Sequence, residues 1–191
     1  MDLVFYVIRH GRTDWNANYK LQGRTDIPLN EEGRQMAREA AKTCREMGFD
    51  LCFTSPRLRA KETAEILLEG TGIPIVEDDR LREMSFGIWD GTEHLFDHPE
   101  LPIYKLFKDP EHYEVSEGAE TFEELFARTG AFVREKVLPL VRQGKKVLVV
   151  GHGAMNCSII AQADHIPIAR FWETGIPNCG LKEVVWKEED L

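Results

Sequence analysis

The chain has 191 residues, which suits one domain or one domain with an inserted cap. Hydrophobic residues make up 42% of it and charged residues 30%, as in ordinary globular proteins. Its formal net charge of −9 argues against nucleic acid as the main partner, because a phosphate backbone requires a basic face. A small anionic substrate remains compatible with this charge, since a local arginine cluster can oppose it.

The cysteine spacing and the hydropathy of the chain argue against metal-binding, redox and membrane-spanning proteins. Cys44, Cys52, Cys157 and Cys179 show no CxxC spacing, so we expect free, mostly buried thiols and neither a zinc site nor a redox dithiol. No stretch is apolar over enough residues to cross a bilayer, so we expect no membrane partner. The apolar run at residues 3–8 is too short for a signal peptide core and lacks a basic leader, so the expected compartment is the cytoplasm.

The predicted elements begin with residues 3–8, a short apolar run typical of a fully buried strand. The pattern then becomes helical over residues 30–47. Asn30 is a suitable N-cap for this helix, and Gly48 lies just past its end. An apolar stripe of alanines with one methionine and one cysteine predicts the face that it buries.

A second strand is predicted at residues 49–54. Ser55 and Pro56 then suit the N-cap and first position of a helix that ends near Gly70. A short apolar run at residues 73–76 predicts a third strand. Strand, helix and strand in this order indicate a parallel unit.

Residues 78–120 form the irregular part of the chain, where three prolines interrupt any long element. Thr121 then begins a helix, and Glu124 three residues later completes a capping-box signature. Pro139 should kink the last turns of that helix, because proline lacks an amide hydrogen.

The C-terminal part contains a buried strand at residues 147–150, a helix that ends near Ala163 and a final strand at residues 181–186. Strands that alternate with helices predict an α/β fold, a three-layer α/β/α sandwich around a mainly parallel sheet. We expect a single domain over residues 1–191, with a small cap-like insertion at about residues 92–120.

Reactive and cationic side chains follow three of the predicted strands. Arg9 and His10 follow the first, Arg57 and Arg59 the second, and His152 the fourth. Because ligands bind at the carboxyl ends of strands in such sheets, these groups could meet above the sheet. Arginines could then hold a phosphoryl group and a neutral imidazole could attack it. Glycines beside both histidines would leave room for the ligand.

Each of these segments alone is better explained as a polar loop or a capped helix, and no proton donor for a leaving oxygen is evident from spacing. Their joint order is more informative. The segment of residues 8–16 and four later segments resemble, in the same order, the histidine phosphatase superfamily, which includes the cofactor-dependent phosphoglycerate mutases. The later segments are Leu21-Gln22-Gly23 with Asp26, Pro28 and Leu29; Ser55 to Ala60 with Thr63-Ala64; Leu81-Arg82-Glu83 with Phe86-Gly87 and Gly91; and Val149 to Gly153.

The resemblance implies a catalytic set. His10 would be the nucleophile that becomes phosphohistidine, with Arg9, Arg59 and His152 around the phosphoryl group. Glu83 would protonate the leaving oxygen and later activate water, which requires it to hold a proton near neutrality. The resemblance implies neither a metal ion nor another cofactor, since the arginines already supply positive charge.

Further residues are expected to contact the substrate. Arg12 stands where many relatives carry glutamate, so it either binds a second anionic group or is a solvated loop arginine. The loop histidines His94, His98 and His112 could also contact substrate, although solvated loop positions are the favoured interpretation. The substrate-binding set implied by the resemblance is Arg12, Thr13, Asn16, Gln22, Gly23 and Gly153.

The expected function is hydrolysis of a small phosphorylated metabolite. The alternatives are phosphoryl transfer as in the phosphoglycerate mutases, and a phosphate-binding module without catalysis. The mutases are generally longer, with a larger insertion and a C-terminal tail that shields the phosphoenzyme from water. Here residues 92–120 are modest and the chain ends soon after Trp186, which favours hydrolysis. The substrate and the oligomeric state remain open.

Overall fold

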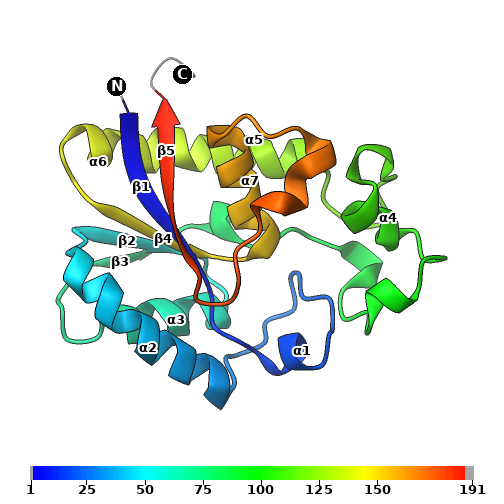
Figure 1. Ribbon diagram of the computed structural model, residues 1–191, viewed down its shortest axis with the longest axis horizontal. Helices are drawn as coiled ribbons and strands as arrows, with labels where there is room; N and C mark the ends of the chain where they lie inside the picture. The colour runs from blue at the N-terminus through cyan, green and yellow to red at the C-terminus, as the bar shows by residue number, and fades with distance from the viewer. Residues whose placement is uncertain (1, 188–191) are drawn as a thin grey trace.

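A computed structural model describes residues 2–187 and contains one five-stranded sheet (Figure 1). The strand order is β3-β2-β4-β1-β5. Neighbouring strands among the first four run parallel, and β5 pairs antiparallel with β1. The predicted mainly parallel sheet is confirmed. The strands are β1 (Asp2–Arg9), β2 (Leu51–Thr54), β3 (Ile75–Glu77), β4 (Val147–Gly151) and β5 (Leu181–Lys187).

Helices cover both faces of the sheet, which confirms the three-layer sandwich. Helices α2 (Glu31–Met47) and α3 (Leu58–Leu68) lie on one face. Helices α5 (Phe122–Phe132), α6 (Leu138–Arg142) and α7 (Gly153–Ala163) lie on the other (Figure 1). The central strands are therefore enclosed between two helical layers.

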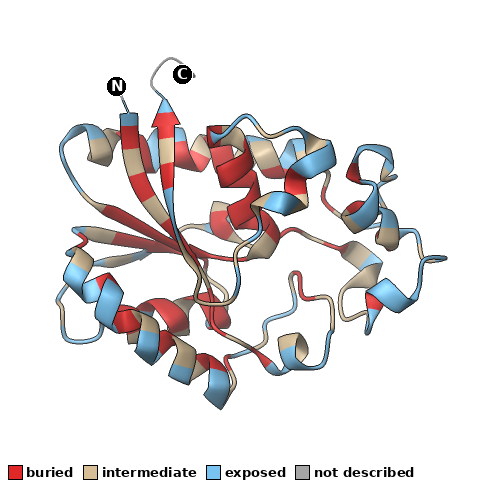
Figure 2. Cartoon of the chain, in the orientation of Figure 1, coloured by how far each residue is buried: buried red, intermediate tan, exposed pale blue. Residues whose placement is uncertain are grey.

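This enclosure explains why the central strands are apolar throughout. Successive side chains of a strand point to opposite faces, so a strand between two layers buries both sets. Phe5, Val7 and Val149 contribute to the hydrophobic cluster beneath α7, whereas Leu148 and Val150 contribute to the cluster beneath α2 and α3. Buried residues accordingly follow the strands and the inward faces of the helices (Figure 2).

Local capping signals in the sequence are confirmed. The Asn30 side chain accepts a hydrogen bond from the Gly33 amide at 2.8 Å, and Gly48 ends α2 in the left-handed conformation with φ 66°. Thr121 and Glu124 form the complete capping box of α5. These signals involve residues close in sequence, which is why the pattern alone was sufficient.

The predicted start of α3 at Ser55 and Pro56 is wrong. The helix begins at Leu58, after Arg57, whose backbone is extended and whose side chain makes no capping hydrogen bond. The Leu58 amide instead donates to Asp26 Oδ1 at 2.8 Å. The capping group is thus supplied by a loop that is distant in sequence, and a local pattern cannot reveal it.

Near Pro139 the hydrogen-bonding pattern of the helix changes, while the predicted kink stays a prediction. Helix α5 continues into a π-helical turn, η5 (Val133–Val137), before α6 begins. Pro139 lies in the first turn of α6. Since proline has no amide hydrogen, the wider turn just before it accommodates the interrupted ladder.

The segment between β3 and α5 forms short helical turns. They are η1 (Asp79–Leu81), η2 (Gly87–Trp89), η3 (Leu95–Asp97), α4 (Ile103–Lys108) and η4 (Pro110–His112). Their buried residues join a cluster with α7 and with η6 (Ile168–Thr174), which fixes the insertion beside the sheet. One further short helix, α1 (Asp14–Ala17), follows β1.

The thiols agree with the expectation from spacing. All four cysteines are free, and three of them are buried. Across the described residues, none of the helices has the length and apolarity needed to traverse a lipid bilayer.

Candidate active site

The carboxyl ends of β1 and β4 bring Arg9, His10 and His152 together. Arg9 is the last residue of β1, His10 follows it, and His152 is the N-cap of α7 after β4. The His10 and His152 rings lie 5.2 Å apart between centroids. Beside them is an inner cavity of about 240 Å³, whose lining includes Arg9, His10, Asn16, Gln22, Glu83 and Gly153.

His10 presents one free ring nitrogen. Its Nδ1 lies 2.7 Å from the carbonyl oxygen of Gly11. A carbonyl can only accept a hydrogen bond, so Nδ1 carries the proton, and the neutral ring keeps its lone pair on Nε2. The backbone of His10 is also fixed, because its amide donates to the Gly151 carbonyl at 3.0 Å and its carbonyl accepts from Asn178 Nδ2 at 2.9 Å.

The surroundings of His10 favour its neutral form. Burial lowers the pKa of His10 well below its usual value of 6.5, and the positive charges of Arg59 and Arg9 lower it further. Only 3% of the residue is exposed. A neutral imidazole with a free Nε2 is the form that can act as a nucleophile.

His152 is fully buried, and neither of its ring nitrogens has a hydrogen-bond partner among the described residues. Burial lowers its pKa well below 6.5, with contributions from Arg59 and His10. Arg9 Nε is likewise buried without a partner. Buried polar groups are normally paired, so these atoms can accept or donate a hydrogen bond to a bound anion.

Glu83 is held at the N-terminus of α7. Its Oε1 accepts hydrogen bonds from the amides of Met84 at 2.8 Å and Met155 at 3.0 Å, and its Oε2 accepts from Ala154 at 3.1 Å. The carboxyl group thus satisfies amides that a helix leaves unpaired at its start. These bonds fix the orientation of Glu83 beside the inner cavity.

Arg9 and Gly153 line the inner cavity together with His10. The Arg9 guanidinium donates from Nη1 to the Ile176 carbonyl at 3.2 Å. Burial lowers the pKa of Arg9, and the nearby charge of Glu83 opposes that effect. A Cβ atom at Gly153 would lie 3.5 Å from Glu83 Oε2 and 3.7 Å from Arg9 Cζ, so a longer side chain there would enter the space between the two groups.

Arg59 lies behind this site and outside the lining of the two cavities that contain Arg9. It is fully buried and donates to the carbonyls of Thr25 at 2.9 Å and Gly23 at 2.8 Å. With its amide oriented to satisfy both neighbours, Gln22 accepts from Arg59 Nε at 3.2 Å. Burial lowers the pKa of Arg59 to about 10, so it remains cationic at neutral pH.

The loop that holds Arg59 is itself held by Asp90, which lies just before the insertion. Asp90 accepts hydrogen bonds from the Gly23 amide at 2.7 Å and from the Thr25 amide at 2.9 Å. Its Oδ2 also accepts from the Thr25 hydroxyl at 2.6 Å. Sequence reasoning did not identify Asp90, because no local pattern marks it.

The remaining predicted substrate-binding residues separate into two groups. Asn16 and Gln22 line the inner cavity. Arg12 does not line it and instead pairs with Glu32 at 2.7 Å, with both side chains exposed. Thr13 is fully buried as the N-cap of α1 and does not line the cavity; its hydroxyl accepts from the Asn16 amide at 3.1 Å and lies 2.7 Å from the side-chain amide of Gln22.

The expected reason for the glycine at position 11 is wrong. A Cβ atom there would lie 2.5 Å from the carbonyl oxygen of Gly33, which is backbone of α2. Gly11 therefore permits close approach of the loop after β1 to α2, whereas Gly153 borders the cavity as expected.

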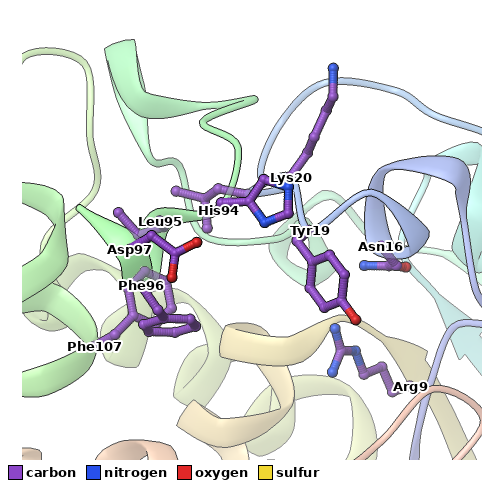
Figure 3. A pocket seen from close by; sticks show the side chains of 10 residues that line it. Arg9, Asn16, Tyr19, Lys20, His94, Leu95, Phe96, Asp97 and Phe107 are labelled. Carbon is purple, nitrogen blue, oxygen red and sulfur yellow. The ribbon is translucent and has the colours of Figure 1, made fainter.

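A second, outer cavity of about 480 Å³ adjoins the inner one (Figure 3). The two share five lining residues, among them Arg9 and Asn16. Of the residues in its lining, the sequence indicated Arg9, Asn16 and His94, and Leu21 lies in one of the motif segments. The others carried no such signal; they are Tyr19, Lys20, Leu95, Phe96, Asp97 and Phe107.

Within residues 2–187, no group of three or more histidine, cysteine, aspartate or glutamate side chains could hold a metal ion. The positive charge near the inner cavity comes instead from Arg9, which lines it, and from Arg59 behind it. This arrangement can bind an anion through guanidinium groups.

Comparisons with known proteins found similar sequences and structures. The family model of the histidine phosphatase superfamily (branch 1) matches residues 5–191. The chain is 34% identical over 191 residues to the uncharacterized phosphatase PhoE of Bacillus subtilis (strain 168), covering 96% of this chain and 91% of PhoE. It is 31% identical over 190 residues to the probable phosphoglycerate mutase GpmB of Escherichia coli O1:K1 / APEC, covering 97% and 86% respectively.

Among solved structures, the fold is similar to that of mycobacterial glucosyl-3-phosphoglycerate phosphatase in complex with VO3. The TM-score is 0.80 at 28% sequence identity, with 94% of this chain and 91% of that chain covered.

Proposed function

Because the chain belongs to the histidine phosphatase superfamily (branch 1) and is a phosphohydrolase of the phosphoglycerate mutase family, we propose that it hydrolyses small phosphomonoesters through a phosphohistidine on His10. The observation that carries this proposal is the hydrogen bond between His10 Nδ1 and the Gly11 carbonyl. It fixes the ring tautomer that leaves Nε2 as the nucleophilic atom.

Binding of the phosphoryl group would use the groups around His10. Arg9 lines the inner cavity with a buried Nε that has no partner among the described residues. His152 contacts the His10 ring and likewise has free ring nitrogens. Arg59 adds positive charge from outside the cavity lining, because its charge lowers the pKa of both His10 and His152. Such preplaced charges stabilise a transferring phosphoryl group more strongly than mobile water does.

The first step forms a bond between His10 Nε2 and phosphorus. The bond between phosphorus and the alcohol oxygen breaks, and Glu83 in its protonated form supplies the proton that the leaving oxygen needs. Glu83 suits this role because it lines the same cavity and its hydrogen bonds to α7 fix its position.

The second step returns the enzyme to its starting state. Glu83, now ionised, takes a proton from a water molecule whose oxygen attacks phosphorus. The bond from phosphorus to Nε2 breaks, and inorganic phosphate leaves. Splitting the reaction in this way replaces one difficult displacement by two easier ones.

Phosphoryl transfer to a second metabolite is the alternative, and relatives such as GpmB carry a mutase name. The openness of the site favours water as the acceptor. The inner cavity continues into the outer one, whose rim residues Tyr19 and Phe96 are 72% and 59% exposed. A phosphoenzyme that water can reach is hydrolysed rather than preserved for transfer.

The test is a trapping experiment in the presence of a strong chelator. Wild type, His10→Ala and the control His98→Ala are mixed with a labelled phosphomonoester, quenched within milliseconds and analysed for acid-labile, alkali-stable phosphate. His98 is an exposed histidine paired with Glu100 at 3.1 Å, outside both cavities. We expect label on wild type and His98→Ala alone, and a loss of turnover of about a million-fold in His10→Ala.

Three outcomes would contradict the proposal. Turnover without any label on wild type would exclude the phosphohistidine. Loss of activity in chelator would show that a metal ion, rather than the arginines, supplies the charge. A long-lived label that transfers to monophosphoglycerate would assign the enzyme to the mutases.

A further inference from the structure

The outer cavity is where the alcohol part of a substrate must extend. It shares Arg9, Asn16, Lys20, Leu21 and Phe107 with the inner cavity, so a group attached to a phosphoryl at His10 continues directly into it. Its volume of about 480 Å³ is ample for a small organic group. Sites for small molecules commonly measure about 300–1,000 Å³.

Aromatic rings form much of its lining. Tyr19 comes from the loop after α1, Phe96 from η3 and Phe107 from α4. Phe96 and Phe107 pack edge to face with centroids 5.7 Å apart. The Phe96 ring already contacts a cation, because Lys108 Nζ lies 4.9 Å from its centroid. Faces of aromatic rings attract organic cations.

Asp97 is the one carboxylate among the described residues of the outer lining, whose cationic side chains are Arg9 and Lys20. Its carboxylate makes no hydrogen bond or ion pair within residues 2–187. Figure 3 shows one of its oxygens turned toward the side of the cavity where His94 and Tyr19 lie and the other toward Phe96. Lys20 does not neutralise Asp97, because its Nζ pairs with Glu93 at 2.7 Å and points away from the cavity in Figure 3.

The wall opposite Asp97 is held in a strained conformation. Tyr19 and His94 both have positive φ angles, 54° and 45°, which non-glycine residues rarely adopt. The His94 amide donates to the Tyr19 carbonyl at 2.9 Å, and their rings lie 5.4 Å apart. Strain of this kind concentrates at ligand-binding positions, where the surrounding structure maintains it.

We propose that the outer cavity selects phosphomonoesters whose alcohol carries a cationic amine on an apolar or aromatic body. The amine would pair with Asp97 while the body stacks on Tyr19, Phe96 and Phe107. A second anionic group at the same place would be repelled by Asp97. This inference rests on the proposed hydrolase function, and it adds the chemical class of the substrate.

The test uses three aryl phosphates that differ in charge at one position: 4-(aminomethyl)phenyl, 4-methylphenyl and 4-carboxyphenyl phosphate. kcat/KM is measured for wild type, Asp97→Asn, Phe96→Leu and the control Glu46→Gln. Glu46 is an exposed residue of α2 outside both cavities, so its change matches the charge lost at Asp97. Comparing ratios between variants cancels the differing reactivities of the phenols.

We expect wild type to prefer the aminomethyl ester over the carboxy ester. The ratio of their kcat/KM values should fall about fivefold in Asp97→Asn and stay unchanged in Glu46→Gln. Phe96→Leu should lower the ratio of the aminomethyl to the methyl ester, because leucine retains apolar contact but has no π face. A ratio that responds equally in Asp97→Asn and Glu46→Gln would overturn the inference.

The neutral ester separates this inference from the proposed function. If wild type hydrolyses 4-methylphenyl phosphate but does not distinguish the two charged esters, the substrate class is wrong and the hydrolase assignment stands. If wild type hydrolyses none of the three esters, the proposed function itself fails.

Discussion

The rings of His10 and His152 meet edge to face at an interplanar angle of 62°, although the residues are distant in sequence. Both follow parallel strands that are direct neighbours in the sheet. Both have pKa values lowered by burial first and by the Arg59 charge next. Two buried, neutral imidazoles therefore stand side by side, which determines how catalysis and folding depend on pH.

The acid limb of the activity profile should lie below pH 6.5. His10 must be neutral to attack, and its lowered pKa keeps it neutral at pH values where an exposed histidine is protonated. We expect kcat/KM to fall only well below pH 6.5, once the profile is corrected for the second ionisation of the substrate phosphate near about 6. Arg59→Met removes one cause of the lowering and should move the limb upward. A limb that does not move would contradict this electrostatic role.

Folding stability should decrease as the medium becomes acidic. Below about pH 6.5 the unfolded chain binds protons at positions 10 and 152, whereas the folded chain does not, so protonation favours unfolding. Each histidine contributes about 1.4 kcal/mol per pH unit within the window between the lowered folded pKa and 6.5. Urea titrations at pH 7.5 and 5.5 should show wild type losing roughly 3 kcal/mol more than His10→Asn/His152→Asn, because two histidines act over one pH unit below 6.5.

The opposite shift at His112 provides a check on that experiment. Its exposed ring lies by Asp109, which raises its pKa, so any stability it contributes is present below pH 6.5 and is lost as the pH rises. Because His112 is retained in both proteins, it cancels in the comparison. Equal pH dependence of wild type and the double variant would contradict the prediction.

The effect of Glu83→Gln on the rate of hydrolysis should depend on whether the leaving group of the substrate needs a proton. Loss of the proton donor should lower kcat for alkyl phosphates by about 10² to 10⁴. p-Nitrophenol leaves without a proton, so the first step with p-nitrophenyl phosphate should persist while the water step is slow. Stopped-flow absorbance should then show a burst of nitrophenol close to one equivalent per enzyme. If the rate of the burst in Glu83→Gln fell by as large a factor as kcat for alkyl phosphates, the role of Glu83 as proton donor would be contradicted.

The loss of kcat/KM caused by a substitution of Gly153 should increase with the size of the new side chain. The Cβ of Gly153→Ala would contact Glu83 and Arg9 at ordinary distances, so this variant should fold and turn over substrate. Gly153→Val would place methyl groups between the two and should lower kcat/KM by about 10² through misplacement of the reacting groups. Thermal unfolding of both variants serves as the control, and an equal effect of alanine and valine would exclude the steric explanation.

The sequence predicted those parts of the fold that depend on near neighbours. Asn30 and Thr121 cap their helices through residues three positions away, and the central strands are uniformly apolar because both their faces are covered. The start of α3 was mispredicted because Asp26 supplies its cap from elsewhere.

In the site, too, the sequence predicted what local motifs mark and missed what contacts between distant segments create. The residues with motif signatures, His10, His152 and Glu83, do meet at one edge of the sheet. Arg12 and Thr13 belong to the same motif, yet an ion pair with Glu32 and a helix cap occupy them. The outer cavity was not predictable, since its wall forms where residues 19–21 hydrogen-bond to residues 91–94 of the insertion.

The hydrogen bonds that hold Arg59 limit how far the insertion can be exchanged between relatives without affecting the catalytic residues. Asp90 precedes the insertion and ties down the loop whose carbonyls hold Arg59, and Arg59 in turn sets the electrostatic environment of both histidines. A chimera that takes a relative's segment from residue 92 onward keeps Asp90 and therefore keeps the contacts that position Arg59. A chimera whose junction lies upstream replaces Asp90. It would change the charge environment of His10 and His152 as well as the substrate preference.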